Sequence, residues 1–180
     1  MIYTYKDCME KWSSNYQIKK QIAARNIFQI EKGIYSDSPD ISDLSVIAAK
    51  YPKAIFTMDS AFYYHGLTDV IPDEYHIATD KHSIRLSDKR IRQYYIPSDI
   101  LNIGVTTTTR RDSTFKIYDK ERMLIELLRY KNKLPFDYYK EILGNYRKLI
   151  YNLDIERIQE YAATFPKSKM ISEALDAEVF

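Results

Sequence analysis

Along the first thirty-six residues the hydrophobic positions follow first the period of a helix and then that of a strand. A short helix is predicted where apolar side chains recur at i, i+3, i+4 and i+7, at Tyr5, Cys8, Met9 and Trp12. Ser13-Ser14 interrupts this stripe, and Ser13, Ser14 or Asn15 can cap a second helix. That helix is predicted from about Asn15 to Arg25, with Ile18 and Ile22 buried.

The next segment alternates with the period of a strand. Ile27–Ile30 predicts one strand, Gly33 supplies a turn, and Ile34-Tyr35 predicts the returning strand. Two helices, a short turn and a small hairpin are typical of a winged helix-turn-helix, which reads DNA. We therefore expect a DNA-binding domain over residues 1–36.

A turn-rich linker, Ser36–Asp40, separates this segment from the rest of the chain. The predicted second domain, residues 41–180, has a small mixed or antiparallel sheet followed by a run of helices, so the fold class is α+β. The predicted strands are Ala54–Met58, Glu74–Thr79, Arg92–Ile96, Val105–Thr109 and Thr114–Tyr118. The predicted helices are Ile41–Tyr51, Ala61–His65 with Asp59 or Ser60 as cap, Lys120–Lys131, Phe136–Tyr151, Asp154–Thr164 and Lys169–Glu178, the last four with Asp119, Asp154 and Ser168 among their caps.

Charge is unevenly distributed along the chain. The net charge of the 180 residues is +2. Residues 1–36 carry +3 and residues 81–111 carry +5, so the remainder is acidic, at −6. Two basic zones in an acidic chain are expected to attract phosphate or an acidic partner.

The predicted second helix has the side chains that DNA recognition uses. Lys and Arg bind phosphate, and Asn and Gln bind base edges. The candidate DNA contacts are Asn15, Tyr16, Gln17, Lys19, Lys20, Arg25 and, in the hairpin, Lys32. The alternative is an ordinary solvated helix face. The second basic zone would form a charged face of the second domain from Lys81, Arg85, Lys89, Arg90, Arg92, Arg110 and Arg111.

No enzyme motif stands out. The histidines, His65, His76 and His82, lack metal-ligand spacing, and no glycine-rich phosphate loop or G-x-S-x-G is present. Asp59 and Asp73 could be imagined as a metal pair, but a helix cap and a turn residue explain them more simply. The single cysteine, Cys8, excludes an internal disulfide and is expected in the core. We expect no cofactor, no metal and no membrane span, and a cytoplasmic location.

Three segments in series resemble the AbiEi antitoxins of type IV toxin–antitoxin (abortive infection) systems. Ile27–Tyr35 looks like the wing of that family. Phe56–Leu67 is similar to its strand, Ser-Ala, helix, Gly-Leu segment. Ile117–Leu127 resembles its Glu-Arg segment, which leads into an aliphatic helix.

The resemblance implies an operon-repressing regulator of phage defence whose partners are the promoter DNA of its own operon and a nucleotidyltransferase-like toxin. The toxin would be countered without a stable complex. Family members usually carry a further helix before the one near Tyr5, so we expect the first domain to depend on packing against the second domain or a second protomer, as in a homodimer. Two alternatives stay open: an interaction or antitoxin module with a degenerate wing, and a nucleic-acid-processing enzyme using Asp59 and Glu121.

Overall fold

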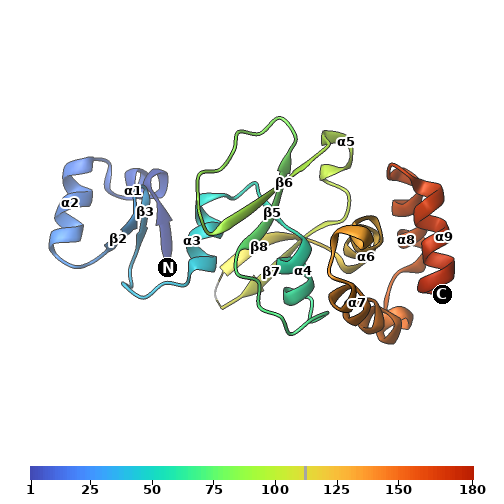
Figure 1. Ribbon diagram of the computed structural model, residues 1–180. Coiled ribbons are helices and arrows are strands. Elements are labelled where there is room, and N and C mark those ends of the chain that lie inside the picture. Colours follow the sequence, from blue (N-terminus) through green and yellow to red (C-terminus); the bar gives the residue numbers. More distant parts are fainter. Residues whose placement is uncertain (112) are drawn as a thin grey trace. The chain divides into compact units, whose positions relative to one another are not determined.

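The computed structural model describes residues 1–111 and 113–180, so Asp112 of the predicted hairpin lies outside the described residues. The fold is α+β, with two sheets and a run of C-terminal helices (Figure 1). Contacts divide the chain into two compact units: unit 1 is residues 1–53 with 108–115, and unit 2 is residues 54–107 with 116–180.

Unit 1 begins with a strand that the sequence pattern did not predict. Its elements are β1 (Ile2–Thr4), α1 (Tyr5–Trp12), α2 (Asn15–Ala23), β2 (Phe28–Glu31), β3 (Ile34–Ser36) and α3 (Asp43–Lys50). The three strands form an antiparallel sheet in the order β1-β3-β2, with Ile2 opposite Ser36. The predicted helices and hairpin are confirmed to within two residues.

Polar caps fix where the helices of unit 1 begin. Thr4 and Asp7 form a reciprocal capping box at the start of α1, and the Ser14 hydroxyl accepts the Gln17 N–H at the start of α2. Cys8 is fully buried, as predicted. It lies in a hydrophobic cluster with Ile18, Ile27, Tyr35, Tyr3, Met9, Trp12 and Ile22. This small core holds α1 and α2 on the sheet.

The helix α3 extends unit 1 beyond the boundary expected at Ser36–Asp40. It packs against β1 and β3, and its Leu44, Val46 and Ile47 side chains are buried. Burial of apolar side chains against the sheet is the reason that this helix, expected in the second domain, belongs to the first compact unit. The three-stranded sheet is therefore covered by a helix of the same unit.

The second sheet has five strands in the order β6-β5-β4-β8-β7. Strand β4 runs antiparallel to β5 and parallel to β8, and β5 runs parallel to β6, so the sheet is mixed. The elements from here to the C-terminus are β4 (Ile55–Phe56), α4 (Met58–Tyr64), β5 (Tyr75–Asp80), β6 (Ile91–Ile96), α5 (Ser98–Leu101), β7 (Val105–Arg110), β8 (Ser113–Tyr118), α6 (Lys120–Tyr130), η1 (Lys131–Lys133), α7 (Phe136–Leu149), η2 (Ile150–Asn152), α8 (Ile155–Thr164) and α9 (Ser168–Glu178).

Helix α6 is the centre of the C-terminal helices. It contacts α4, α7, α8 and α9, which stack around it in Figure 1. Every residue from Arg122 to Leu128 is buried, so these residues form no solvent face of the kind that an amphipathic helix has. A helix buried on all sides must satisfy its charged side chains internally.

Of the caps predicted in unit 2, two are confirmed and two are wrong. Asp119 accepts the Arg122 N–H and Asp154 accepts the Arg157 N–H, as predicted. Helix α4 instead starts at Met58 after Thr57, which places Asp59 and Ser60 inside its first turn. Helix α9 starts at Ser168 itself, after Lys167 in the left-handed region. Neither Thr57 nor Lys167 makes a side-chain cap bond, so each of these starts lacks the signal that a sequence pattern detects.

Candidate nucleic-acid interface

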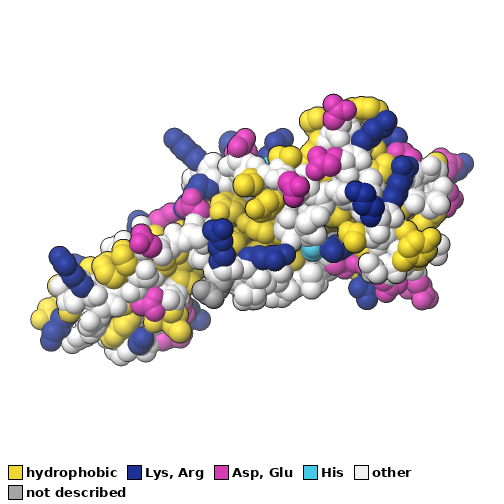
Figure 2. All heavy atoms as spheres, turned by 90° about the horizontal axis from the view of Figure 1, so that it is seen from below, with side chains coloured by type: hydrophobic (Ala, Val, Ile, Leu, Met, Phe, Trp, Pro, Cys, Tyr) yellow, Lys and Arg dark blue, Asp and Glu magenta, His cyan; other side chains and the backbone are white. Residues whose placement is uncertain are grey.

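The outer face of α2 is an exposed polar surface of unit 1. Ile18 is 3% exposed and anchors the helix in the core, which turns the opposite side to solvent. The predicted DNA contacts on this helix and after it are all exposed: Asn15, Tyr16, Gln17, Lys19, Lys20 and Arg25. Figure 2 shows Lys and Arg side chains protruding at the left end, which α2 forms. The burial of Ile18 therefore decides which side chains can meet a ligand.

The cations of this face keep their charge available. Among the described residues, Lys19, Lys20 and Arg25 have no carboxylate within ion-pair distance. Arg25 has φ +58°, in the left-handed region, where the chain turns from α2 toward β2. Unpaired, solvated lysines and arginines are the groups that bind phosphate.

The amide side chains of α2 differ in how far they are engaged. The Asn15 Oδ1 accepts the Tyr5 hydroxyl at 2.9 Å, and the Gln21 Oε1 accepts the Asn26 amide at 2.8 Å. The Gln17 side chain has no hydrogen bond within the described chain. The three amides on this helix are thus not equivalent in what they can offer a ligand.

The β2–β3 hairpin presents the last predicted DNA contact, Lys32. Gly33 has φ +82°, and its carbonyl accepts the Tyr5 N–H at 2.8 Å, which fixes the turn beside the start of α1. Lys32 is exposed, whereas the neighbouring Glu31 pairs with Lys50 at 3.1 Å. The hairpin tip therefore carries an available positive charge.

The second basic zone lies in unit 2, on β6 and the loop before it. A hollow of about 950 Å³ is lined by Arg85, Lys89 and Arg92, together with Glu74, Asp88 and Tyr95. The Gln93 side chain holds the loop by accepting the Leu86 N–H at 2.8 Å and donating to the Ile84 carbonyl at 3.1 Å. Lys81, Arg85, Lys89 and Arg92 are exposed as predicted, while Arg90 is half-buried and bound to Asp88 at 2.8 Å.

Arg110 and Arg111 do not belong to that face. They were predicted with Lys81–Arg92, but contacts assign residues 108–115 to unit 1. The Ser113 hydroxyl bonds the Ser45 hydroxyl of α3, which ties this end of the β7–β8 hairpin to the first unit. Arg111 lines a hollow of about 410 Å³ there, beside Ser38, Ser42 and Ser45. The predicted basic face is therefore distributed over both units.

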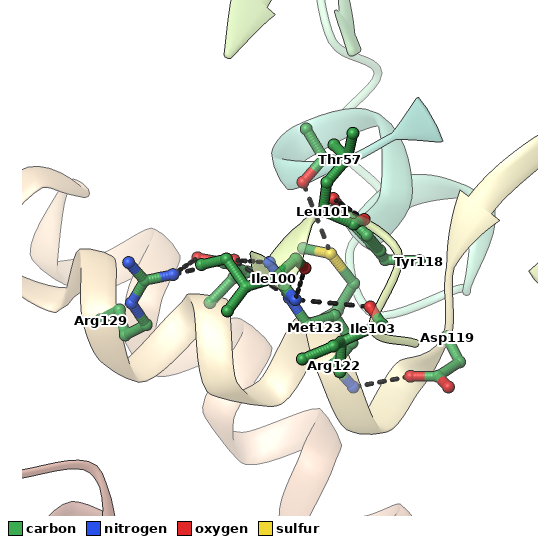
Figure 3. Close-up of polar contacts among 10 residues, drawn as sticks. Thr57, Ile100, Leu101, Ile103, Tyr118, Asp119, Arg122, Met123 and Arg129 are labelled. Atoms are coloured by element: carbon green, nitrogen blue, oxygen red, sulfur yellow. Dashed lines mark hydrogen bonds and ion pairs between the residues drawn. The ribbon is translucent and has the colours of Figure 1, made fainter. Parts of the chain in front are cut away.

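The Ile117–Leu127 segment and the rest of α6 carry a buried ion network. The Arg122 guanidinium, 0% exposed, bonds Glu126 Oε1 from Nη2 at 2.7 Å and the Ile100 carbonyl from Nη1 at 2.8 Å. Arg129 donates to both Glu126 oxygens, at 3.0 and 2.9 Å. Figure 3 shows these contacts converging on α6. Every charge in the network has a partner inside the protein, and Arg122 and Glu126 are buried, so the network holds structure.

Aromatic rings and a glycine complete that network. The Arg122 guanidinium lies 4.0 Å from the Phe165 ring centroid and 4.5 Å from that of Tyr118, whose hydroxyl donates to the Leu101 carbonyl at 2.8 Å. A Cβ on Gly104 would lie 2.5 Å from the Arg122 Cβ. Burial raises the pKa of Asp119, even though the Arg122 N–H and the Tyr161 hydroxyl donate to its carboxylate.

The candidate enzyme residues are engaged in structural contacts. Glu121 Oε1 accepts the Asp154 N–H at 3.1 Å, before α8. Asp59 Oδ1 accepts the Tyr138 hydroxyl at 3.3 Å, and its Oδ2 lies 3.7 Å from His76 Nδ1. Burial lowers the pKa of His76, and Asp59 opposes this shift. Asp73 is exposed in the loop before β5, and no cluster of three or more metal-ligating side chains occurs among the described residues.

The Phe56–Leu67 and Ile117–Leu127 segments pack together in unit 2. His65 Nε2 hydrogen-bonds the Tyr118 carbonyl at 2.6 Å, and Thr57 Oγ1 donates to Met123 Sδ at 3.8 Å. The Ser60 hydroxyl accepts the His76 N–H at 2.8 Å, and Gly66 ends the helix with φ +69°. Sequence reasoning did not identify this pairing.

Comparisons with known proteins bear on the fold of this chain. No protein-family model matches the chain, and no curated protein matches it. The chain is similar to the crystal structure of the RV2827C protein from Mycobacterium tuberculosis, with a TM-score of 0.64 and 15% sequence identity. The match covers 98% of this chain and 71% of that chain. None of the helices within residues 1–111 and 113–180 has the length and apolar character needed to cross a bilayer. At this identity the similarity establishes a shared α+β fold.

Proposed function

We propose that this protein is a DNA-binding regulator of the AbiEi antitoxin type, which represses its own operon and counters a nucleotidyltransferase-like toxin. The observation that carries the DNA-binding part is the outer face of α2. That face presents Gln17, Lys19 and Lys20 to solvent with no internal partner among the described residues. Such side chains on a helix held by its buried side are suited to the major groove.

The arrangement of unit 1 supports a winged helix-turn-helix. Helices α1 and α2 are separated only by Ser13 and Ser14, with Ser13 in the left-handed region at φ +61°. The β2–β3 hairpin follows directly and carries Lys32 at its tip. We assign α2 to base and phosphate contacts and the hairpin to backbone contacts. In unit 1, Arg110 and Arg111 would add phosphate contacts, and in unit 2 the hollow around Arg85, Lys89 and Arg92 would offer a separate phosphate-binding surface.

We assign the antitoxin part to unit 2. Two of the three segments that resemble the family lie in this unit and bond to each other through His65 and the Tyr118 carbonyl. Asp59 and Glu121 take part in helix and loop contacts, which favours a binding role over catalysis. The toxin would be the product of a neighbouring gene. A neighbouring gene without nucleotidyltransferase character would contradict this assignment.

A gel-shift titration with the DNA upstream of its own gene tests the DNA-binding part. Binding is expected at low salt, and the logarithm of the association constant should fall steeply with that of salt concentration, because several phosphates are neutralised. A mixed-sequence duplex of the same length is the control and should bind more weakly. Absent binding, or binding that salt does not weaken, contradicts the proposal.

The degenerate-wing alternative predicts a different result with the full chain. A Lys19→Ala/Lys20→Ala variant would then protect cells from the toxin as the original protein does, and neither protein would shift DNA. Our proposal predicts that the variant protects from the toxin but loses repression of a promoter fusion. Reporter activity and growth in the same strain distinguish the two.

A further inference from the structure

Strand β6 lies at one edge of the five-stranded sheet, with β5 as its neighbour in the strand order. The Ile96 carbonyl accepts the N–H of Lys81, just after β5. Because successive residues of a strand point their backbone groups to opposite sides, Gln93 and Tyr95 turn theirs away from β5. Among the described residues, no hydrogen bond reaches the backbone N–H or C=O of Gln93 or Tyr95. This edge therefore offers both donors and acceptors to a ligand.

The same edge borders the hollow of about 950 Å³ in unit 2. Its cations, Arg85, Lys89 and Arg92, are exposed, and within residues 1–111 and 113–180 none has a carboxylate at ion-pair distance. Glu74 and Asp88 line the hollow as well, and Asp88 is already bound in an ion pair. A ligand there would meet more free positive than negative charge, which favours an anion.

Tyr95 places an aromatic ring beside these charges. The residue lines the hollow and is 46% exposed, and its hydroxyl donates to Gln93 Oε1 at 3.3 Å. Gln93 is fixed in turn, since its Nε2 donates to the Thr79 hydroxyl at 2.8 Å. A ring that is held by its hydroxyl loses little freedom when a flat group stacks on it.

We propose that this hollow binds single-stranded nucleic acid. Its phosphates would bind Arg85, Lys89 and Arg92, and a base would stack on Tyr95. The backbone groups of Gln93 and Tyr95 would bond the Watson–Crick edge of a base, which carries donors and acceptors side by side and is open only in an unpaired strand. The inference rests on the phosphate-binding surface proposed for unit 2, and it is independent of duplex binding by α2.

An acidic peptide that adds a strand to β6 is the competing occupant. Strand addition gains its affinity from a row of main-chain hydrogen bonds along the edge. Here the outward N–H of Ile91 already donates to the Asp88 carbonyl. The outward residues with both backbone groups open are Gln93 and Tyr95, which is short for a strand but sufficient for a base. The edge and the ring together favour nucleic acid.

Fluorescence anisotropy with a short labelled oligonucleotide tests the inference in the full chain. Single-stranded RNA and DNA of one mixed sequence are the probes, and Lys19→Ala/Lys20→Ala is the background, which removes the α2 lysines. Tyr95→Ala should weaken binding by at least about fivefold, the lower end for one stacked base. Tyr151→Ala is the matched control, because Tyr151 is 97% exposed and lies outside the hollow. Tyr95→Phe keeps the ring and should bind more tightly than Tyr95→Ala.

The cations have a test that does not depend on Tyr95. Arg85→Ala/Lys89→Ala should make the slope of log association constant against log salt shallower by about 1.4, for two single-strand phosphates. Lys133→Ala/Lys169→Ala removes the same charge from exposed positions elsewhere and should leave the slope unchanged.

Binding of either single strand with these losses supports the inference. Absent binding of both, equal affinities of Tyr95→Ala and Tyr151→Ala, or equal slopes of the two double variants overturns it. Displacement of the probe by polyglutamate as effectively as by unlabelled oligonucleotide also overturns it, in favour of the acidic peptide. The original protein's binding to promoter duplex is measured alongside, so a loss of the single-strand site alone leaves the proposed DNA-binding function of α2 intact.

Discussion

The outer face of α2 and the interior of α6 both concentrate charge, but they use it in opposite ways. Lys19 and Lys20 on α2 are exposed, with no carboxylate partner among the described residues. Arg122 and Glu126 on α6 are 0% and 2% exposed and bond each other, a backbone carbonyl and Arg129. Charges that are fully bound inside hold a fold, and charges left in solvent remain available to a partner.

Because of this difference, the most recognisable segment of the sequence and the residues that a ligand can reach are not the same. The Glu-Arg segment resembles a family, and its arginine is buried in a structural network. The basic residues of α2 belong to no sharp motif, yet they are the ones a ligand can reach. We therefore expect substitutions in α6 to change stability and substitutions in α2 to change binding.

Loss of Arg122 should have the largest effect. Arg122→Leu leaves Glu126 buried with Arg129 as its remaining cation, so the free energy of unfolding is expected to fall by about 3–5 kcal/mol. Urea unfolding followed by circular dichroism measures the change. Arg85→Leu, at an exposed site, should change it by less than about 0.5 kcal/mol. Equal effects of the two substitutions would contradict the structural role of Arg122.

A methyl group at Gly104 should have the next largest effect. Gly104 has φ +72°, and an added Cβ would meet the Arg122 and Asp119 side chains at 2.5 and 3.0 Å. Gly104→Ala is expected to lower the free energy of unfolding by about 1–3 kcal/mol. Gly144→Ala is the matched control, because this helical glycine has open space around it and alanine favours helix. A neutral Gly104→Ala would show that the packing there can relax.

Acidification should destabilise unit 2 through His76. Burial holds its pKa below the ordinary value near 6.5, so the unfolded chain takes up a proton at a higher pH than the folded chain. The stabilisation from neutral His76 is complete above the unfolded-state pKa near 6.5. It is lost as pH falls toward the folded-state pKa, by at most about 1.4 kcal/mol per pH unit. Unfolding in urea between pH 7 and 5 should show a weaker pH dependence in His76→Gln. His82→Gln, at an exposed site, should keep the original slope.

The α2 lysines should have the smallest effect on folding. Lys19→Ala/Lys20→Ala is expected to change the free energy of unfolding by less than about 0.5 kcal/mol. On DNA, the slope of log association constant against log salt should become shallower by about 1.8, for two phosphate contacts. Lys167→Ala/Lys169→Ala removes the same charge from the start of α9 and should leave the slope unchanged. Equal slopes for both variants would show that Lys19 and Lys20 do not contact DNA phosphates.

The sequence predicted most helices and strands because their apolar spacing matched their burial. It missed β1, since three residues are too short to show a period and this strand exists only by pairing with β3. It misplaced the start of α4, because Thr57 makes no side-chain cap bond there. The capping box of Thr4 and Asp7 was a usable signal for α1, and the Arg122–Glu126 spacing of four residues was one for the buried pair.

Local physics determined which helices form, where most of them are capped, and which side of α2 is apolar, because those properties depend on neighbouring residues. The tertiary structure decided the properties that depend on residues far apart. It buried Arg122 among Ile100, Tyr118 and Phe165, joined α3 to the first sheet, assigned Arg110 and Arg111 to unit 1, and engaged the Asn15 oxygen with Tyr5. The sequence determines which polar groups the protein has, and tertiary packing determines which of them remain free. A polar group that is bound inside the fold is no longer available to a ligand.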